Sequence, residues 1–177
     1  FGLVRLVNSC GNNIYQVREN CIKFLAGDSV GPPGYVLWID SDNPPSALSF
    51  AHLWGAIQAD PIVSCIGGWY RFFNEATKEV MIAAGKMGAY YTNITEAEIL
   101  ESVEAQKIIQ VPFIGFGMCL MKWQMIQDIG VDEAFKPYHF PTPDPETGRT
   151  WATDDSGFFA QATLKGHKIF LHPGVFL

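Results

Sequence analysis

The chain has 177 residues, with 12 lysines and arginines against 18 aspartates and glutamates, so its formal net charge is −6. The length predicts about one domain with its own core, and the acidic balance excludes the basic surface by which proteins hold a nucleic-acid backbone. Hydrophobic residues make up 48% of the chain and charged residues only 17%, which excludes the composition of disordered proteins.

Apolar spacing and turn residues predict strands alternating with helices along the chain. In the first part we expect a strand over 3–7, a helix over 14–26, a strand over 35–39, a helix over 46–59 capped by Ser46, and a strand over 61–66 closed by Gly67 and Gly68. In the second part we expect a hairpin or irregular segment over 69–84, an acidic helix from Thr95, a strand over 111–122, a helix over 123–129, a loop over 135–149, a helix over 154–165 stopped by Gly166, and a strand over 169–171. This order predicts a single α/β domain over 1–177, with a mostly parallel sheet and helices on both faces.

The cysteines and the first residues bear on the compartment. Cys10, Cys21, Cys65 and Cys119 lie far apart and form no Cys-x-x-Cys pair, which predicts reduced thiols in a cytosol-like compartment. The start at Phe1 has neither the basic region nor the long apolar region of a signal peptide. Since no apolar run reaches the roughly 18 residues of a membrane span, we expect a cytoplasmic protein without an integral membrane segment.

Two aspartates, Asp40 and Asp42, follow the predicted buried strand 35–39 directly. In open α/β sheets, ligands bind beyond the carboxyl ends of the strands. Carboxylate oxygens suit Mg²⁺ or Mn²⁺, and either cation neutralises a diphosphate. The pattern predicts a cation site here, and the alternative is that these aspartates only cap the helix that follows.

A second acidic pair, Asp154 and Asp155, begins the predicted helix 154–165. A carboxylate close to another acid can serve as a general base that accepts a proton from a hydroxyl. We assign that role to Asp155, with Asp154 positioning or binding the acceptor. The alternative is structural, because carboxylates at a helix start are stabilised by the helix dipole.

The predicted strand 111–122 contains Gly115 and Gly117. A glycine within a strand often marks the close approach of a ligand or of another backbone, and the alternative is a bulge. The Gly-x-Gly pattern lacks the third glycine and the helix of a phosphate-binding fingerprint.

These segments, in this order, resemble a family 2-like glycosyltransferase of the GT-A fold. Segment 35–43 is similar to the strand with the Asp-x-Asp motif of that family, and segment 111–122 to the glycine-containing strand that borders its acceptor site. Segment 153–169 is similar to its Glu-Asp-x-x-Phe helix with the following glycine and strand, although the acidic pair here is Asp-Asp. Segment 16–20 is similar to an Arg-Asn element before the Asp-x-Asp strand, and the resemblance covers about 3–177.

The resemblance implies a hexosyltransferase of carbohydrate biosynthesis. Such an enzyme moves a sugar from a nucleotide-diphosphate sugar to a hydroxyl of a glycan, lipid or protein, using Mn²⁺ or Mg²⁺. Asp42 would bind the metal, Asp40 would help or reach the ribose, and Asp155 would be the base of an inverting displacement. Arg18 and Asn20 would lie near the nucleotide.

The resemblance also suggests further site residues. His172 would substitute for a metal-binding histidine that the family often has after its last strand. Gly115 and Gly117 would border the acceptor. Apart from the resemblance, the aromatic rings of Trp69, Tyr70 and Trp151 could stack on a base or sugar, and the alternative is that they belong to the core. The first strand of the family has no counterpart here, so we expect a domain truncated at one or both ends.

Two other functions stay open. A phosphohydrolase of the HAD type would use Asp40 as its nucleophile, but that class places its motif near the N-terminus, with Thr or Val two residues past the second aspartate. Here 39 residues precede Asp40, and Asn43 and Pro44 follow Asp42. The other alternative is a non-catalytic module that binds a nucleotide sugar or a metal, and no pattern predicts the oligomeric state.

Overall fold

The computed structural model describes residues 6–7, 13–43, 45–75, 77–87, 89–139, 151–152 and 154–177. In chain order, the elements of these residues are α1 (Ile14–Gly27), β1 (Tyr35–Ile39), α2 (Ala47–Ala59), β2 (Val63–Trp69), β3 (Arg71–Asn74), β4 (Glu79–Ile82), β5 (Gly85–Lys86), β6 (Ala89–Asn93), α3 (Glu96–Glu104), β7 (Ile109–Val111), β8 (Met118–Lys122), α4 (Trp123–Ile129), β9 (Tyr138–His139), β10 (Trp151–Ala152), α5 (Asp154–Leu164) and β11 (Lys168–Phe176). The chain therefore has the predicted α/β composition.

A five-stranded sheet in the order β1-β8-β2-β11-β7 forms the centre of the molecule. Only β2 and β11 pair in parallel, while β1 with β8, β8 with β2, and β11 with β7 pair antiparallel. The expectation of a mostly parallel sheet is therefore wrong. The alternation of strands and helices that suggested it does not fix the direction of neighbouring strands. The apolar run 35–39, which we expected to be a buried strand, is the edge strand β1, in which only Val36 is buried.

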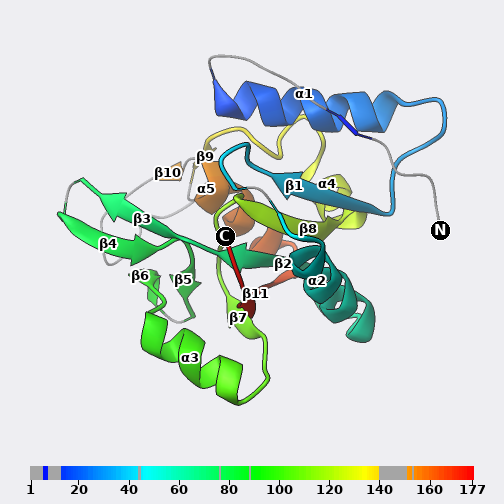
Figure 1. Ribbon diagram of the computed structural model, residues 1–177. Helices are drawn as coiled ribbons and strands as arrows, with labels where there is room; N and C mark the ends of the chain where they lie inside the picture. The colour runs from blue at the N-terminus through cyan, green and yellow to red at the C-terminus, as the bar shows by residue number, and fades with distance from the viewer. Residues whose placement is uncertain are drawn as a thin grey trace.

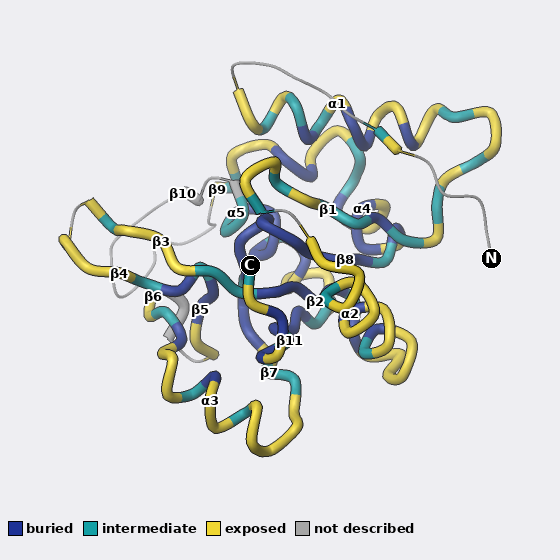
Figure 2. The backbone as a smooth tube through the Cα atoms, in the orientation of Figure 1, coloured by how far each residue is buried: buried dark blue, intermediate teal, exposed yellow. Residues whose placement is uncertain are grey.

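Helices cover both faces, as predicted (Figure 1). On one face α2 packs against β2, β8 and β11 around a small apolar cluster that includes Leu53, Ile66 and Phe170. On the other face a larger cluster joins residues of α1, α4 and α5, among them Ile22, Ile126 and Phe159. Figure 2 shows the buried backbone concentrated in the sheet, whereas α2 and α3 are largely exposed.

Local signals place the helix ends as the sequence predicts. The Ser46 side chain accepts a hydrogen bond from the Ser49 backbone N–H at the start of α2. Thr95 and Glu98 form the predicted capping box of α3, in which each side chain bonds the other residue's backbone N–H. Gly166, with φ of 87°, follows α5 and adopts the left-handed conformation that favours glycine.

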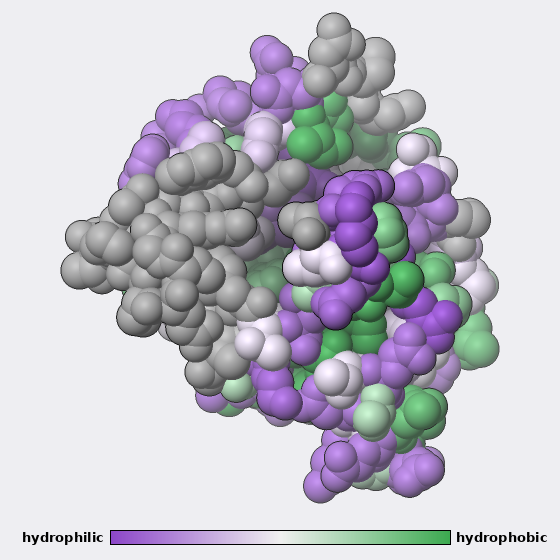
Figure 3. Space-filling model, turned by 90° about the vertical axis from the view of Figure 1, so that its left-hand side faces the viewer, coloured by the Kyte–Doolittle hydropathy of each residue, from purple (hydrophilic) through white to green (hydrophobic). Residues whose placement is uncertain are grey.

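Several strand predictions need correction. β2 continues through Gly67 and Gly68 instead of ending there, and the hairpin expected over 69–84 is β3 paired with β4. Figure 3 faces the side of the molecule that carries this hairpin, where hydrophilic and hydrophobic residues are interspersed. The last strand is longer than expected and runs from Lys168 to Phe176.

Segment 111–122 is not one strand. β7 ends at Val111 and β8 begins at Met118, and between them Ile114 forms an isolated antiparallel bridge with Ala84. The Gly115 N–H donates to the Ala83 carbonyl at 2.6 Å, and the Gly117 carbonyl accepts from the Asp40 N–H at 3.0 Å. The first bond joins the segment to Ala83, between β4 and β5, and the second extends the β1–β8 pairing by one residue pair.

Two further predictions fall largely on residues outside the description. In the strand expected over 3–7, only Leu6 and Val7 are described, and they have no regular structure. In the loop expected over 135–149, Tyr138 and His139 form β9, which pairs with β10. Cys10 also lies outside the described residues, and the other three cysteines are free and buried.

Candidate functional site

Arg18 of α1 is the centre of the candidate site. The residue is only 5% exposed, and its guanidinium carbon lies 4.2 Å from the centre of the Phe116 ring. One guanidinium nitrogen (Nη1) donates to Oδ1 of Asp155 at 2.7 Å, and the other (Nη2) lies 3.5 Å from Oδ1 of Asp40. A buried arginine is stable only with such compensation, because its charge cannot be removed at physiological pH.

Asp155 is held from two sides at the start of α5. Its Oδ1 receives the Arg18 hydrogen bond, and its Oδ2 accepts from the Phe116 backbone N–H at 3.1 Å. About a quarter of the side chain (26%) is exposed. The contacts fix the carboxylate in position and favour its ionised form, while part of the group faces solvent.

Asp40 and Asp42 lie where β1 ends. The Asp40 backbone is fixed by bonds to Gly117 and Asn43, and its side chain is 34% exposed beside Arg18. Asp42 is exposed, and its Oδ1 accepts a hydrogen bond from the Asn43 side chain at 3.0 Å. The two carboxylates therefore differ: Asp40 is paired with the arginine, and Asp42 faces solvent.

Tyr70 lies over the glycine segment of the same site. A Cβ atom added to Gly117 would lie 2.7 Å from the Tyr70 ring, and one added to Gly115 would overlap the phenol group. Burial, followed by the charges of Asp155 and Asp40, raises the pKa of the Tyr70 phenol well above its usual value. The phenol thus keeps its proton at physiological pH and is available as a hydrogen-bond donor.

The contact with Tyr70 gives a reason for glycine at positions 115 and 117 that differs from the one we expected. We expected a ligand or another backbone to approach these glycines, and the structure shows the Tyr70 side chain there. Any acceptor that borders this segment would therefore meet the tyrosine as well as the glycines.

The remaining predicted residues do not all join this group. Asn20 is exposed on α1, two residues and therefore about 200° around the helix from Arg18. Trp69 is half-buried, its ring lies tilted against that of Phe176 with 4.6 Å between ring centres, and its Nε1 donates to the Pro173 carbonyl at 2.8 Å. The side chains of Trp151 and Asp154 lie outside the described part of the structure.

His172 lies on the α2 side of the sheet, away from Arg18. Its ring centre is 5.0 Å from that of His52 on α2, and its Nδ1 is buried without a hydrogen-bond partner among the described residues. Burial and the neighbouring His52 lower the pKa of His172. The structure thus pairs His172 with His52 and does not bring it to the Arg18 group.

A metal ion at this site would depend on the aspartates after β1. Among the described residues, no group of three or more His, Cys, Asp or Glu side chains is arranged to hold a metal ion. Mg²⁺ and Mn²⁺ are often held by one or two carboxylates together with water and substrate phosphates, and an exposed Asp42 with Asp40 nearby fits that mode of binding.

Two other polar features lie away from this group. His167 bridges Ser64 of β2 and Asp128 of α4, with 3.1 Å to each, and so ties the start of β11 to α4. A cavity of about 420 Å³ lies between α3 and the β5–β7 region, with Lys86, Glu98 and Lys107 in its wall. Neither feature includes a residue that the sequence analysis assigned to the site.

The aromatic residues that enclose the carboxylates were not placed there from the sequence: Tyr70 was considered only as a ring that stacks on a base or sugar, and Phe116 was given no role. Tyr70 contacts Gly115 and Gly117, and Phe116 contacts Arg18 with its ring and Asp155 with its backbone N–H. The two members of each contact are far apart in the chain. No local pattern marks either residue, since aromatic side chains near strand ends usually belong to the core.

The described helices include none that is long and apolar enough to cross a bilayer. In comparisons with protein-family models and with curated proteins, the chain matches no family and no curated protein.

Proposed function

We propose that this chain is a glycosyltransferase of the GT-A type, which moves a sugar from a nucleotide-diphosphate sugar to an acceptor hydroxyl with Mn²⁺ or Mg²⁺. One observation carries the proposal: Asp40 of the Asp-x-Asp turn after β1 and Asp155 at the start of α5 both contact the guanidinium group of Arg18. Arg18 and Asp155 are 137 positions apart in the chain and form a 2.7 Å hydrogen bond. The two acidic motifs thus form one site instead of two separate helix caps.

In this proposal, the exposed Asp42 holds the cation, and Asp40 assists it. Asp42 and Asp40 would hold the cation beside the diphosphate of the donor, where its positive charge would stabilise that group as it leaves. The Asp40 backbone bonds to Gly117 and Asn43 keep the turn in one conformation. Nucleotide binding would then depend on the metal and on Asp42.

Asp155 acts as the general base. A carboxylate must be ionised to accept a proton, and the contacts with Arg18 and the Phe116 N–H favour that form. The acceptor oxygen loses its proton to Asp155 and forms the new bond to the anomeric carbon, while the bond to the diphosphate breaks on the opposite side. Arg18 is a positioning residue because it acts by orienting Asp155.

The test is a set of nucleotide sugars, with UDP and GDP as the first bases, assayed with Mn²⁺ for binding by calorimetry and for release of the nucleoside diphosphate. Asp155→Asn should lower turnover by about 10²–10⁴-fold and leave donor binding nearly unchanged. Asp42→Asn should weaken the metal-dependent binding. Asp132→Asn is the matched control, because Asp132 is 75% exposed and pairs with Lys23 on the surface.

Each failure has a distinct meaning. Absence of any metal-dependent nucleotide binding would refute the transferase, and full turnover by Asp155→Asn would refute its role as the base. Binding without transfer or hydrolysis would identify a non-catalytic binding module. Release of phosphate without a sugar acceptor, lost in Asp40→Asn, would identify the phosphohydrolase.

A further inference from the structure

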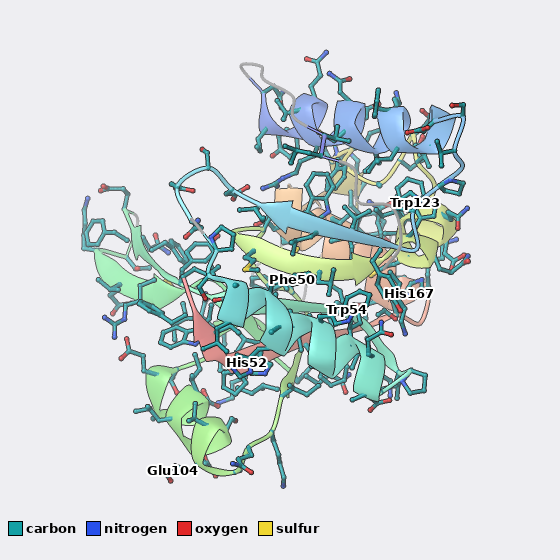
Figure 4. The ribbon with its side chains drawn as sticks, turned by 45° about the vertical axis from the view of Figure 1, so that its right-hand side comes forward. Phe50, His52, Trp54, Glu104, Trp123 and His167 are labelled. Atoms are coloured by element: carbon teal, nitrogen blue, oxygen red, sulfur yellow. The ribbon has the colours of Figure 1, made fainter. Side chains whose placement is uncertain are left out.

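The histidine pair formed by His52 of α2 and His172 of β11 lies outside the Arg18 group. The two rings come from elements that pack on each other, with 5.0 Å between the ring centres and 49° between the ring planes. Figure 4 shows His52 on α2, beside β11. Neither ring has a hydrogen bond to another described residue. The two imidazoles therefore face each other without a polar partner that would explain their position.

The spacing of the rings fits two ligands of one metal ion. Imidazole nitrogens bind Zn²⁺ at about 2.0–2.1 Å, and each nitrogen lies about 1.1 Å from the centre of its own ring. Two such ligands at about 90–109° around one ion therefore have ring centres about 4.5–5.2 Å apart. The observed 5.0 Å falls within this range, and the tilt between the rings allows their in-plane lone pairs to converge on one point.

Both rings have a nitrogen that an ion can reach. His52 is exposed, whereas His172 is half-buried with its Nδ1 enclosed, so Nε2 is the nitrogen of His172 that can meet an ion and its water ligands. Gly174 lies beside this ring, where a Cβ atom would be 3.4 Å from Cε1, and its lack of a side chain leaves the ring edge uncovered. Burial and His52 lower the pKa of His172, which favours the neutral form that a metal ligand requires.

The surroundings of the pair favour an ion that prefers imidazole. Helix α2 has no Lys or Arg to repel a cation, and it has no Asp or Glu to add the oxygen ligands that Mg²⁺ needs. Imidazole suits Zn²⁺, Ni²⁺ and Cu²⁺, whereas carboxylates suit Mg²⁺ and Mn²⁺. The pair therefore selects a different class of ion from the one proposed for Asp42, which lies away from it.

We propose that His52 and His172 form a binding site for a late first-row divalent cation such as Zn²⁺, which joins α2 to β11. Water molecules complete the coordination, because the described residues place no third protein ligand beside the two rings. With half the ligands of a structural zinc site and about half its binding free energy, the dissociation constant is about 1–200 μM. The proposal is independent of the proposed function.

Calorimetric titration of the whole chain with ZnCl₂ tests this site, with MgCl₂ in excess to occupy carboxylates. The wild-type chain should bind Zn²⁺ with a dissociation constant in the range given above. His52→Gln and His172→Gln should each weaken that binding at least about tenfold, because one imidazole ligand is lost. Asp42→Asn should leave it unchanged. Circular dichroism establishes that each variant is folded.

His139→Gln is the matched control. It also removes one exposed histidine, but from β9, so it should leave Zn²⁺ binding unchanged. A second measurement is the melting temperature, because an ion held by both α2 and β11 binds only the folded chain. Zn²⁺ at ten times its dissociation constant should raise the wild-type melting temperature by about 3–6 °C, and this shift should be lost in His52→Gln.

Three results would overturn the proposal. The first is a wild-type chain that binds no Zn²⁺ at concentrations up to about 1 mM, above the expected dissociation constant. The second is Zn²⁺ binding that neither His52→Gln nor His172→Gln weakens. The third is binding that is lost in Asp42→Asn and kept in His52→Gln, which would place the ion at the aspartates after β1. None of these results depends on whether the chain transfers a sugar.

Discussion

The Arg18 site and the outward face of α2 lie on opposite sides of the same sheet. They differ in character: the first is a buried charge with partners in its own chain, and the second is an apolar surface exposed to solvent. Arg18 is 5% exposed and is held by two carboxylates and an aromatic ring within its own chain. Trp54 on α2 is 40% exposed, and its outward surroundings are small and uncharged. Buried charge must be paired inside the fold, whereas exposed apolar surface can be covered by another molecule. Substitutions should therefore lower the free energy of unfolding much more at the first region than at the second.

The largest effect should follow removal of the buried cation. Arg18→Leu leaves Asp40 and Asp155 without their shared partner and should lower the free energy of unfolding by about 3 kcal/mol, measured by urea titration. We expect the low end of the range that is usual for removing one partner of a buried ion pair. The two carboxylates are 34% and 26% exposed, so water solvates part of the charge that loses its partner.

Arg71→Leu is the control for this effect. Arg71 also pairs with a glutamate, Glu96, but both side chains are about half exposed, and such a surface pair contributes at most about 1 kcal/mol. If Arg18→Leu were as mild as Arg71→Leu, the Arg18 group would not be an essential part of the fold.

A pair of glycine substitutions sharpens the comparison with a smaller effect. Gly115→Ala forces a methyl group against the Tyr70 phenol and should cost about 2 kcal/mol. Gly55→Ala meets open space within α2 and should raise stability by up to about 1 kcal/mol, because alanine is the better helix former. Both are measured by urea unfolding.

Tyr70→Ala provides a further check on the Gly115 result. If the methyl group clashes with the phenol, the double variant Tyr70→Ala, Gly115→Ala should lose less than the sum of the two single variants. Strict additivity would mean that the cost at Gly115 has another origin.

The smallest effect should depend on pH and involve the histidine pair formed by His52 of α2 and His172 of β11. Burial and His52 lower the pKa of His172 in the folded state, so as the pH falls through about 6.5 the unfolded chain takes up this proton first. Wild-type stability should therefore fall with decreasing pH until the folded pKa is passed, and this contribution should be fully present above the unfolded value.

His172→Gln should reduce that acid-dependent loss, as measured by urea unfolding at pH 8 and pH 5.5. His139→Gln is the control, since His139 is exposed on β9. An equal pH dependence in wild type and His172→Gln would contradict the burial of His172 as the cause.

Much of the local structure could be predicted from short-range patterns. β1 has its predicted bounds, and Ser46, Thr95 and Gly166 mark helix ends as expected. These signals depend on contacts between residues a few positions apart, so they are visible in the sequence. The directions of the strands could not be predicted, because an alternation of strands and helices does not state which way a neighbouring strand runs.

For the candidate site, too, part could be predicted from the sequence and part depended on tertiary contacts. The Asp-x-Asp turn and the Asp-Asp helix start were chosen from the sequence by their chemistry and position, and both contribute to the Arg18 group. The role expected of Gly115 and Gly117 changed, because the side chain of Tyr70, which is far from them in the sequence, packs against them. His172 was grouped with the aspartates by its place near the last strand, and strand orientation directs it toward His52 instead.

By itself, the sequence determined that this protein is an α/β protein and where most of its helices begin and end, and it singled out Asp40 and Asp155 before any contact between them was known. These properties follow from composition and from interactions within a few residues of the chain. Tertiary structure alone decided that Arg18 joins Asp40 to Asp155 and that Tyr70 lies over the glycines. Such contacts join residues far apart in the chain, so they are set by the packing of the whole domain and by the need to pair each buried charge.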